Sequence, residues 1–274
     1  MDVNTIRFLS FIMVFGAMLI LEKFFPRHPT VDSKLRRMGV HLTLTGVDII
    51  AVRLVFGAAA VGAAHYSMGK NWGILNQTNW PGSLEMIFAV IVLDLSIYTQ
   101  HVAVHLIPLF WRFHIVHHTD LDLDVSSGLR FHPIEILISM LYKILIVFAI
   151  GPTPMAVMVF EAILNGMSLF THSNVKLPER LDFSLRQLLV TPDMHRIHHS
   201  TEPDETNSNY GFNLSIWDRL LGTYLQNARK PQPEILIGID SYRSPNSVSL
   251  KNLLIMPFAN PPANQSQPEQ RKNL

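Results

Sequence analysis

Cysteine is absent from this 274-residue sequence, and charged residues are scarce. Without cysteine the chain can form no disulfide, no thiolate zinc site and no cysteine-ligated iron–sulfur cluster. Asp, Glu, Lys and Arg make up only 16% of the residues, whereas they average about 25% in soluble domains. The formal net charge is +1, so the composition gives no sign of a nucleic-acid partner.

Several familiar catalytic motifs are absent as well. The sequence contains no Walker A or Rossmann glycine pattern, and it has no nucleophile elbow and no haem-attachment motif. The segment from His101 to His105, HVAVH, lacks the glutamate of the His-Glu-x-x-His motif. A zinc protease of that class is therefore not indicated.

Long apolar runs, by contrast, are abundant, and hydrophobic residues make up 48% of the chain. The run 6–24 is long enough to cross a bilayer of about 30 Å. We interpret it as a retained anchor, because its N-terminal region carries only Arg7 and no small-residue cleavage site follows. Further runs cover residues 42–64, 84–104, 134–150 and 155–170. The last run is short, and a full span, a re-entrant segment and a buried helix all fit it. The sequence thus predicts about four to five membrane helices.

Asp48, Arg53 and Asp94 are ionisable residues inside these runs. A charge within hydrocarbon is costly and normally faces a partner or a cavity. For Asp48 and Arg53, a buried ion pair between helices and a functional role fit equally well. Asp94 lies seven residues before His101 on the same helical face. It is expected either to orient that histidine or to pair with Arg53.

The histidines are the most informative feature of the sequence. Of thirteen, eight fall into three clusters with the spacing of one helical face: His101 and His105; His114, His117 and His118; His195, His198 and His199. Residues three and four apart share a face, so each cluster is expected to aim its ring nitrogens at one point. Neutral imidazole is the commonest metal ligand, and it suits iron, zinc, copper or nickel rather than magnesium or calcium.

The number of histidines predicts two metal ions. His132 and His172 raise the candidate ligands to ten, whereas one ion takes roughly four to six. Unrelated surface or core histidines would not produce three clusters with helical spacing. We interpret three nearby acidic residues as caps and solvated turns rather than ligands: Asp120, Asp122 and Asp124.

Basic residues predict how the chain is oriented in the membrane. The loop after the first run carries five Lys or Arg residues and the next loop carries one, which places the first loop in the cytoplasm. If 134–170 forms a hairpin that crosses twice, every histidine cluster and the C-terminus lie on that same side. Such a nitrogen-rich site for two metals at a membrane surface suggests iron and oxygen chemistry on a C–H bond.

The order of the clusters resembles the fatty acid hydroxylase / sterol desaturase superfamily of integral membrane non-haem diiron enzymes. The likeness covers roughly residues 85–225, and segments within it support the resemblance: 94–98, 130–135, 171–174, 191–200, 209–212 and 217–224. It implies an all-α membrane helical bundle with a cytoplasmic helical cap that holds a histidine-rich site for two metals. We divide the chain into N-terminal membrane helices and a basic loop (1–84), a histidine-box catalytic domain with the membrane hairpin (85–225) and a polar tail (226–274).

The resemblance also implies the site residues and the chemistry. Nine histidines are carried over as metal ligands: His101, His105, His114, His117, His118, His172, His195, His198 and His199. His132 matches a family histidine and is expected to bind metal or to orient a ligand, a role that is also open to Asp94. Some relatives have a further histidine where this chain has Lys176. No catalytic residue beyond the ligands is implied.

The expected cofactors are two ferrous ions, with zinc able to replace them in purified protein, and O2 is the expected co-substrate. The expected reaction is hydroxylation or desaturation of a C–H bond in a membrane lipid. Candidate substrates are an acyl chain, a sterol or hopanoid-like ring, a carotenoid and an amino-lipid head group. Because no fused electron-transfer domain is recognised, electrons are expected from a separate protein. The expected location is a bacterial inner membrane, or the endoplasmic reticulum in a eukaryote.

Two other classes of function remain open from the residues. A metal-binding membrane transporter or sensor would use polar residues inside the spans to line a path: Asp48, Arg53, Asp94, Lys143 and Glu161. Hydrolysis at a site for two zinc ions is the third hypothesis, and the near absence of carboxylates from the clusters makes it less attractive.

Overall fold

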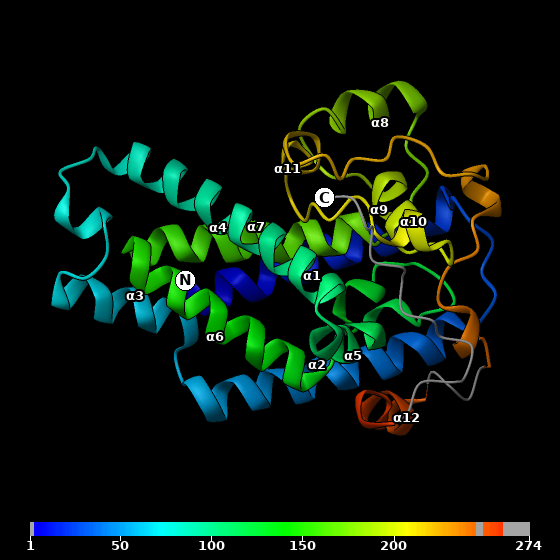
Figure 1. Cartoon of the computed structure of the whole chain (residues 1–274), viewed down its shortest axis with the longest axis horizontal. Coiled ribbons are helices and arrows are strands. Elements are labelled where there is room, and N and C mark those ends of the chain that lie inside the picture. Colours follow the sequence, from blue (N-terminus) through cyan, green and yellow to red (C-terminus); the bar gives the residue numbers. More distant parts are fainter. Residues whose placement is uncertain (1–2, 245–248, 260–274) are drawn as a thin grey trace.

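The computed structural model describes residues 3–244 and 249–259, and throughout them the ordered elements are helices. Within these two ranges there is no β-strand, and only isolated bridges such as that between Pro26 and Val175 occur. Figure 1 shows long helices running together, with short helices and loops gathered around one end of them. The predicted all-α fold is therefore confirmed for the described residues.

The long helices are α1 (Val3–Phe24), α2 (Lys34–Phe56), α3 (Ala59–Lys70), α4 (Gly82–Leu106), α6 (Pro133–Ile150) and α7 (Pro154–Thr171). Four segments are long and apolar enough to cross a membrane: Lys34–Gln77, Gly82–Leu106, Pro133–Ile150 and Pro154–Thr171. Large apolar side chains on them are exposed, for instance Leu54 and Leu145, as expected for surfaces that face lipid. Helix α1 coincides with the first predicted run, and its crossing of the membrane stays a prediction.

Helices α6 and α7 form the predicted hairpin, and local signals set their ends. A proline occupies the first position of each helix, after the caps His132 and Thr153. Helix α6 ends at Gly151, whose φ of 65° is in the left-handed region that favours glycine. The loop after α3 touches this turn, and a Cβ on Gly73 would lie only 2.3 Å from the backbone nitrogen of Gly151. The close contact between the loop and the turn therefore requires glycine at position 73.

The second apolar run differs from its prediction. Instead of one helix over residues 42–64, the chain forms α2 and α3, with a break at Gly57 and Ala58. Gly57 has a φ of 59° and Ala59 a φ of 51°, and these left-handed conformations interrupt the helix. The interruption leaves α2 packed on α6 while α3 packs on both α6 and α7. Hydropathy does not reveal such a break, because both helices are apolar.

Short helices form a cap at one end of the bundle. They are α5 (Pro108–His118), η2 (Ser127–Leu129), α8 (Glu179–Leu185), α9 (Pro192–His198), α10 (Pro203–Thr206), α11 (Ile216–Leu220), η3 (Gln232–Glu234), η4 (Asp240–Tyr242), α12 (Leu250–Ile255) and η6 (Met256–Phe258). The short helix η1 (Leu75–Gln77) lies at the opposite end of the bundle. From the C-terminal segment, Leu253 and Met256 are buried against Leu44 of α2 and against Ile115 and Val116 of α5. The end of the described chain thus covers the helix that carries the second histidine cluster.

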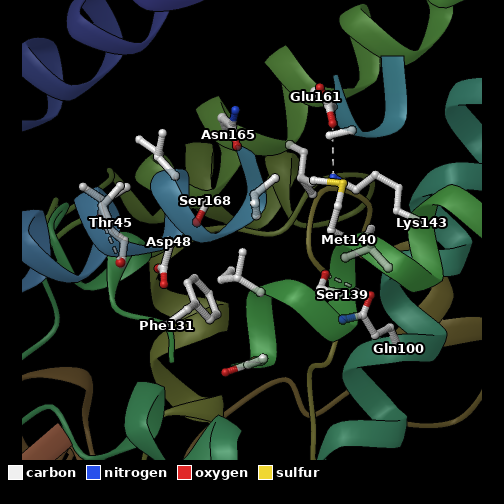
Figure 2. Close-up of a pocket in the computed structure, with 18 of the residues that line it drawn as sticks. Thr45, Asp48, Gln100, Phe131, Ser139, Met140, Lys143, Glu161, Asn165 and Ser168 are labelled. Atoms are coloured by element: carbon white, nitrogen blue, oxygen red, sulfur yellow. Dashed lines mark hydrogen bonds and ion pairs between the residues drawn. The ribbon is translucent and has the colours of Figure 1, made fainter. Parts of the chain in front are cut away.

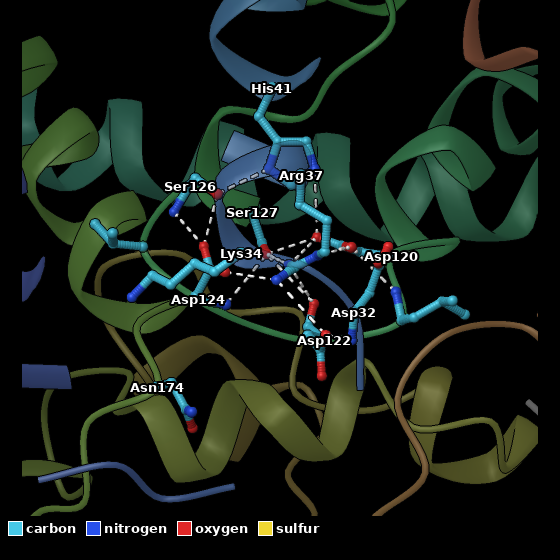
Figure 3. A network of polar contacts seen from close by, with 12 residues as sticks. Asp32, Lys34, Arg37, His41, Asp120, Asp122, Asp124, Ser126, Ser127 and Asn174 are labelled. Atoms are coloured by element: carbon cyan, nitrogen blue, oxygen red, sulfur yellow. Dashed lines mark hydrogen bonds and ion pairs between the residues drawn. The ribbon is translucent and has the colours of Figure 1, made fainter. Parts of the chain in front are cut away.

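An ionic network fixes the segment after α5 to α2 (Figure 3). The Arg37 guanidinium donates to Asp120 at 2.7 and 2.6 Å and to Asp124 at 2.6 Å. Arg130 pairs with Asp120 at 3.0 Å, and all four side chains are buried. Burial alone would raise the pKa of Asp120, but the two guanidiniums hold it well below its usual range. The prediction of solvated turns for these acids is therefore wrong, because they are buried partners of arginines.

Candidate metal centre

Nine buried histidines form two adjoining groups. The five-histidine group contains His101, His105, His114, His118 and His198, and the four-histidine group contains His117, His172, His195 and His199. Within each group the candidate ligand atoms all lie within 4.8 Å of one another. The nine members are the nine histidines carried over from the resemblance. We propose below that they bind metal ions.

Four helices deliver these side chains to one place. Helix α4 carries His101 and His105, α5 carries the second cluster, α9 carries His195 and His198, and His172 is the C-cap of α7. His199 follows directly as the C-cap of α9. Since these elements are far apart in sequence, only the packed bundle produces the centre.

The second and third clusters are each divided between the two groups, which differs from the expectation of one point per cluster. In α5, His114 and His118 enter the five-histidine group while His117 enters the other. In α9, His198 enters the five-histidine group while His195 and His199 enter the other. The reason is helical geometry: residues i and i+4 are about 40° apart around the axis, and i+3 lies about 60° to the other side of i. Each of these helices therefore contributes to both groups.

The spacing of the ring nitrogens fits metal binding. In the four-histidine group, the Nε2 atoms of His117 and His172 are 3.0 Å apart, as are those of His172 and His195. Two ligands at right angles on bonds of about 2.1 Å would be separated by about 3.0 Å. In the five-histidine group, four Nε2 atoms are buried without a hydrogen-bond partner, namely those of His105, His114, His118 and His198. Unpartnered buried nitrogens are costly, and a metal ion would satisfy them.

Hydrogen bonds on the far side of five rings orient them. Four Nδ1 atoms lie against backbone carbonyls: His101 on Tyr210 (2.7 Å), His117 on Arg130 (3.2 Å), His172 on Ser168 (2.8 Å) and His198 on Ser208 (2.8 Å). His114 instead uses its Nδ1 atom to contact the Glu135 carboxylate at 2.6 Å. A ring that donates from Nδ1 keeps the lone pair of Nε2 free for a metal.

The protonation state also suits ligation. Burial, reinforced by neighbouring imidazoles, lowers the pKa of several rings well below its usual value: His117, His118, His195 and His199. Burial lowers the pKa of His172 to about 4 and that of His198 to about 3. These six imidazoles are therefore neutral at pH 7, the form that binds metals.

His132 and Asp94 lie outside both groups. The Nδ1 atom of His132 accepts from the backbone N–H of Ile134 at 3.1 Å, so this histidine caps α6. The Asp94 carboxylate accepts from Trp217 Nε1 at 2.7 Å, which ties α11 to α4. In the described part of the chain, Asp94 contacts neither His101 nor Arg53, so neither of its two expected contacts is formed.

Glu135 is the residue of the centre whose role the sequence did not reveal. It stands three residues after His132 in the first turn of α6, where an acid is ordinary for helix stability. Its contact with His114 depends on the packing of α5 on α6. Phe131, just before this helix, stacks on His117 with ring centroids 4.4 Å apart. The carbonyls that orient the other rings carry no side-chain signal at all.

A half-open cavity of about 1150 Å³ leads from the bundle to the histidines. It reaches His101, His114, His117 and His195. Apolar side chains such as Phe131 and Met140 line it, together with polar ones such as Asp48 (Figure 2). Lys143 and Glu161 form an ion pair of 3.4 Å in its wall. A volume of this size is sufficient for a lipid-sized ligand.

Comparison with known proteins agrees with this arrangement. The sequence profile described as fatty acid hydroxylase matches residues 86–223, the part of the chain that contains all nine histidines of the two groups. No solved structure gives a significant match.

Curated relatives cover a similar region. The chain is 34% identical over 160 residues to ornithine lipid hydroxylase OlsE of Rhizobium tropici, covering 57% of this chain and 46% of that protein. It is 30% identical over 137 residues to alkylglycerol monooxygenase of Xenopus tropicalis, covering 50% of this chain and 30% of that protein. A Delta(7)-sterol 5(6)-desaturase of Eremothecium gossypii is 24% identical over 223 residues, which are 81% of this chain and 59% of that protein. The match spans less than half the length of the first two relatives.

Proposed function

Because the chain belongs to the fatty acid hydroxylase family, we propose that it is a membrane oxidoreductase that uses O2 to hydroxylate or desaturate a C–H bond of a lipid. One observation carries the proposal: two adjoining groups of buried histidines face a cavity that opens from the membrane bundle. The names of its relatives, which include a lipid hydroxylase, a monooxygenase and a desaturase, support the same class of reaction.

We assign one metal ion to the five-histidine group and one to the four-histidine group. All-nitrogen donors favour iron, zinc, copper or nickel, and iron is the choice because the proposed reaction uses O2. Bound iron would supply the two-electron activation of O2 that C–H cleavage requires. Either reaction consumes the lipid, O2, two electrons and two protons; hydroxylation releases the hydroxylated lipid and one water, and desaturation releases the unsaturated lipid and two waters. A separate electron-transfer protein is the proposed source of the electrons.

The protein's own residues have three tasks in this reaction. Neutral imidazoles bind the metals, and backbone carbonyls behind four of the rings hold those rings in place. The apolar wall of the cavity holds the lipid and excludes bulk water from the centre. Buried residues of α12 and η6 pack on α2 and α5 and cover the helix that carries the second histidine cluster. The proposed location is a multi-pass membrane position with the histidines on the cytoplasmic side.

The transporter or sensor hypothesis receives less support. Four of its five candidate residues line the cavity, namely Asp48, Arg53, Lys143 and Glu161, whereas Asp94 does not. The same cavity also touches four histidines of the two groups. A catalytic metal centre accounts for this contact, whereas a transport path would have to continue beyond it.

The proposal is tested by mass spectrometry of total lipids from cells that produce the protein in air. The wild type should produce a lipid that gains one oxygen or loses two hydrogens, and this product should be missing without O2. The double variant His195→Ala, His198→Ala should produce none and should bind less iron. His28→Ala is the matched control, because His28 lies outside both groups and is partly exposed. Metal flux across vesicles without any lipid product would overturn the proposal.

A further inference from the structure

Two carboxylates in the cavity wall have oxygen atoms without a partner. Asp48 of α2 is 6% exposed and Glu135 of α6 is 7% exposed. Asp48 Oδ1 and Glu135 Oε2 are both buried without a hydrogen-bond partner. The other oxygen of Glu135 contacts the Nδ1 atom of His114. Both residues line the cavity, and Figure 2 shows the Asp48 carboxylate pointing into it near Phe131.

No cation of the described residues neutralises Asp48. Lys143, the buried cation of the cavity wall, pairs with Glu161, and Arg53 is exposed and makes no ion pair with Asp48. Asp48 and Glu135 line the same cavity, and each has one buried oxygen without a partner. Burying two carboxylates without a counter-charge is costly. A ligand that brings a positive charge with N–H donors would supply both the missing counter-charge and the unmet hydrogen bonds.

We propose that the cavity binds the head group of a lipid through a protonated amine that contacts Asp48 and Glu135. An ammonium offers three donors and one positive charge, which matches two carboxylates with a free oxygen each. The apolar part of the wall then holds hydrocarbon of the same molecule. Since Glu135 touches His114, head-group carbons lie beside the histidines in this arrangement. The inference rests on the proposed function and adds the class of substrate to it.

Binding to the purified protein in nanodiscs tests the inference without turnover. The probe is an N-acyl amino-acid lipid with a free side-chain amine, compared with the same lipid acetylated on that amine. The amine lipid should bind at least about ten-fold more tightly, the usual scale for a charge-assisted hydrogen bond in a dry site. The free amino acid without its acyl chain should not compete. Equally good competition by it would show that the ligand is a soluble amine and would overturn the lipid assignment.

Asp48→Asn should abolish the preference for the amine lipid. Asp94→Asn is the matched control, because Asp94 is also a buried acid of a membrane helix with an unpartnered oxygen but does not line the cavity. It should keep the preference. If Asp48→Asn does not fold, the comparison of the two lipids on the wild type still decides the question, since equal binding would overturn the inference. A persistent preference in Asp48→Asn would overturn it as well.

Failure of this inference and failure of the proposed function give different results. If wild-type cells make an oxygenated lipid while the purified protein binds both test lipids equally, the proposed function is supported and the amine site is refuted. If the protein prefers the amine lipid but forms no lipid product with iron, O2 and a reductant, the amine site is supported and the proposed oxygenase function is refuted.

Discussion

At the residue scale, the histidines of the two groups differ in what holds the ring nitrogen on the far side. Four rings lie against backbone carbonyls, and His114 lies against the carboxylate of Glu135. A carboxylate partner makes an imidazole a stronger donor to metal than a carbonyl does. The five-histidine group therefore contains a ligand that is tuned by a charge, and the described bonds of the four-histidine group contain none.

Replacing Glu135 by alanine should weaken metal binding in the five-histidine group. The loss of such an outer carboxylate typically costs about 10- to 100-fold in affinity. Competition with a chelator, followed by metal analysis, measures the two sites separately as two phases of release. One phase should shift and the other should remain. Glu234→Ala, an exposed acid of η3, is the control, and identical release curves for all three proteins would contradict the prediction.

The lowered pKa values also predict how the metal-free protein responds to pH. Burial holds the pKa of His172 near 4 and that of His198 near 3, whereas histidines of the unfolded chain titrate near 6.5. Between these values the unfolded chain binds more protons, so the folding free energy is complete above about pH 6.5 and falls as the pH drops toward 4. Each such histidine contributes a slope of roughly 1.4 kcal/mol per pH unit.

Denaturation midpoints of chelator-treated protein between pH 8 and pH 4.5 test this dependence. They should be level at the alkaline end and should fall steeply below pH 6.5. Protein loaded with metal should resist acid further, since bound metal competes with protons. A midpoint that stays constant down to pH 5 would show that the buried histidines do not titrate as described.

At the element scale, the bundle and the cap are joined by specific contacts between α2 and the segment from 119 to 130. Arg37 of α2 pairs with Asp120 and Asp124 inside the protein. This segment begins directly after His118 and ends at Arg130, whose carbonyl orients His117. The ionic network therefore determines the position of a residue that touches the four-histidine group.

Removing Arg37 should destabilise the protein by about 3–5 kcal/mol, because buried carboxylates would lose their partner. Arg37→Ala is compared with Arg36→Ala, since Arg36 is the neighbouring arginine, is 41% exposed in its side chain and pairs with Asp32 on the surface. The control should lose no more than about 1 kcal/mol. Thermal unfolding in detergent gives both values, and equal losses for the two variants would refute the role assigned to the network.

At the scale of the whole molecule, the four candidate membrane segments and the position of the cap predict one topology. The residues of the cap and the ends of α4, α6 and α7 that carry histidines lie together at one end of the bundle. The loop between α3 and α4 lies at the opposite end. The distribution of basic residues predicts that the histidine end is cytoplasmic.

Reporter fusions test this topology. A reporter after Leu274 should be active on the cytoplasmic side, and one inserted at Asn76, between α3 and α4, should be active on the other side. The reporter at Asn76 is inserted within the full-length chain, so all membrane helices remain present. Recovery of this fusion in the membrane fraction shows that the chain still inserts. A reporter after Leu274 that is active only outside the cytoplasm would disprove the assigned orientation.

The sequence by itself determined the helical class, the apolar segments and the identity of the clustered histidines. Hydropathy and helical spacing are local properties, so they can be read before the chain folds. The hairpin of α6 and α7 was predicted within a residue or two, because Gly151, Pro154 and Thr153 are local signals for ends and starts of helices. Local patterns did not reveal the break at Gly57. Packing on α6 and α7 favours this break, and hydropathy carries no information about which helices pack together.

Only the tertiary structure decided which histidines belong together. Helical spacing separates His117 from His114 and His118, but only the positions of α4, α9 and His172 determine which histidines each of them joins. The same holds for Glu135, whose local setting is that of an ordinary acid in a first helical turn and whose contact with His114 exists only because α5 lies beside α6. Asp94 illustrates the converse, since its spacing pointed to His101 while folding gave it Trp217. Contacts between segments depend on the relative placement of helices, which no periodicity within one helix encodes.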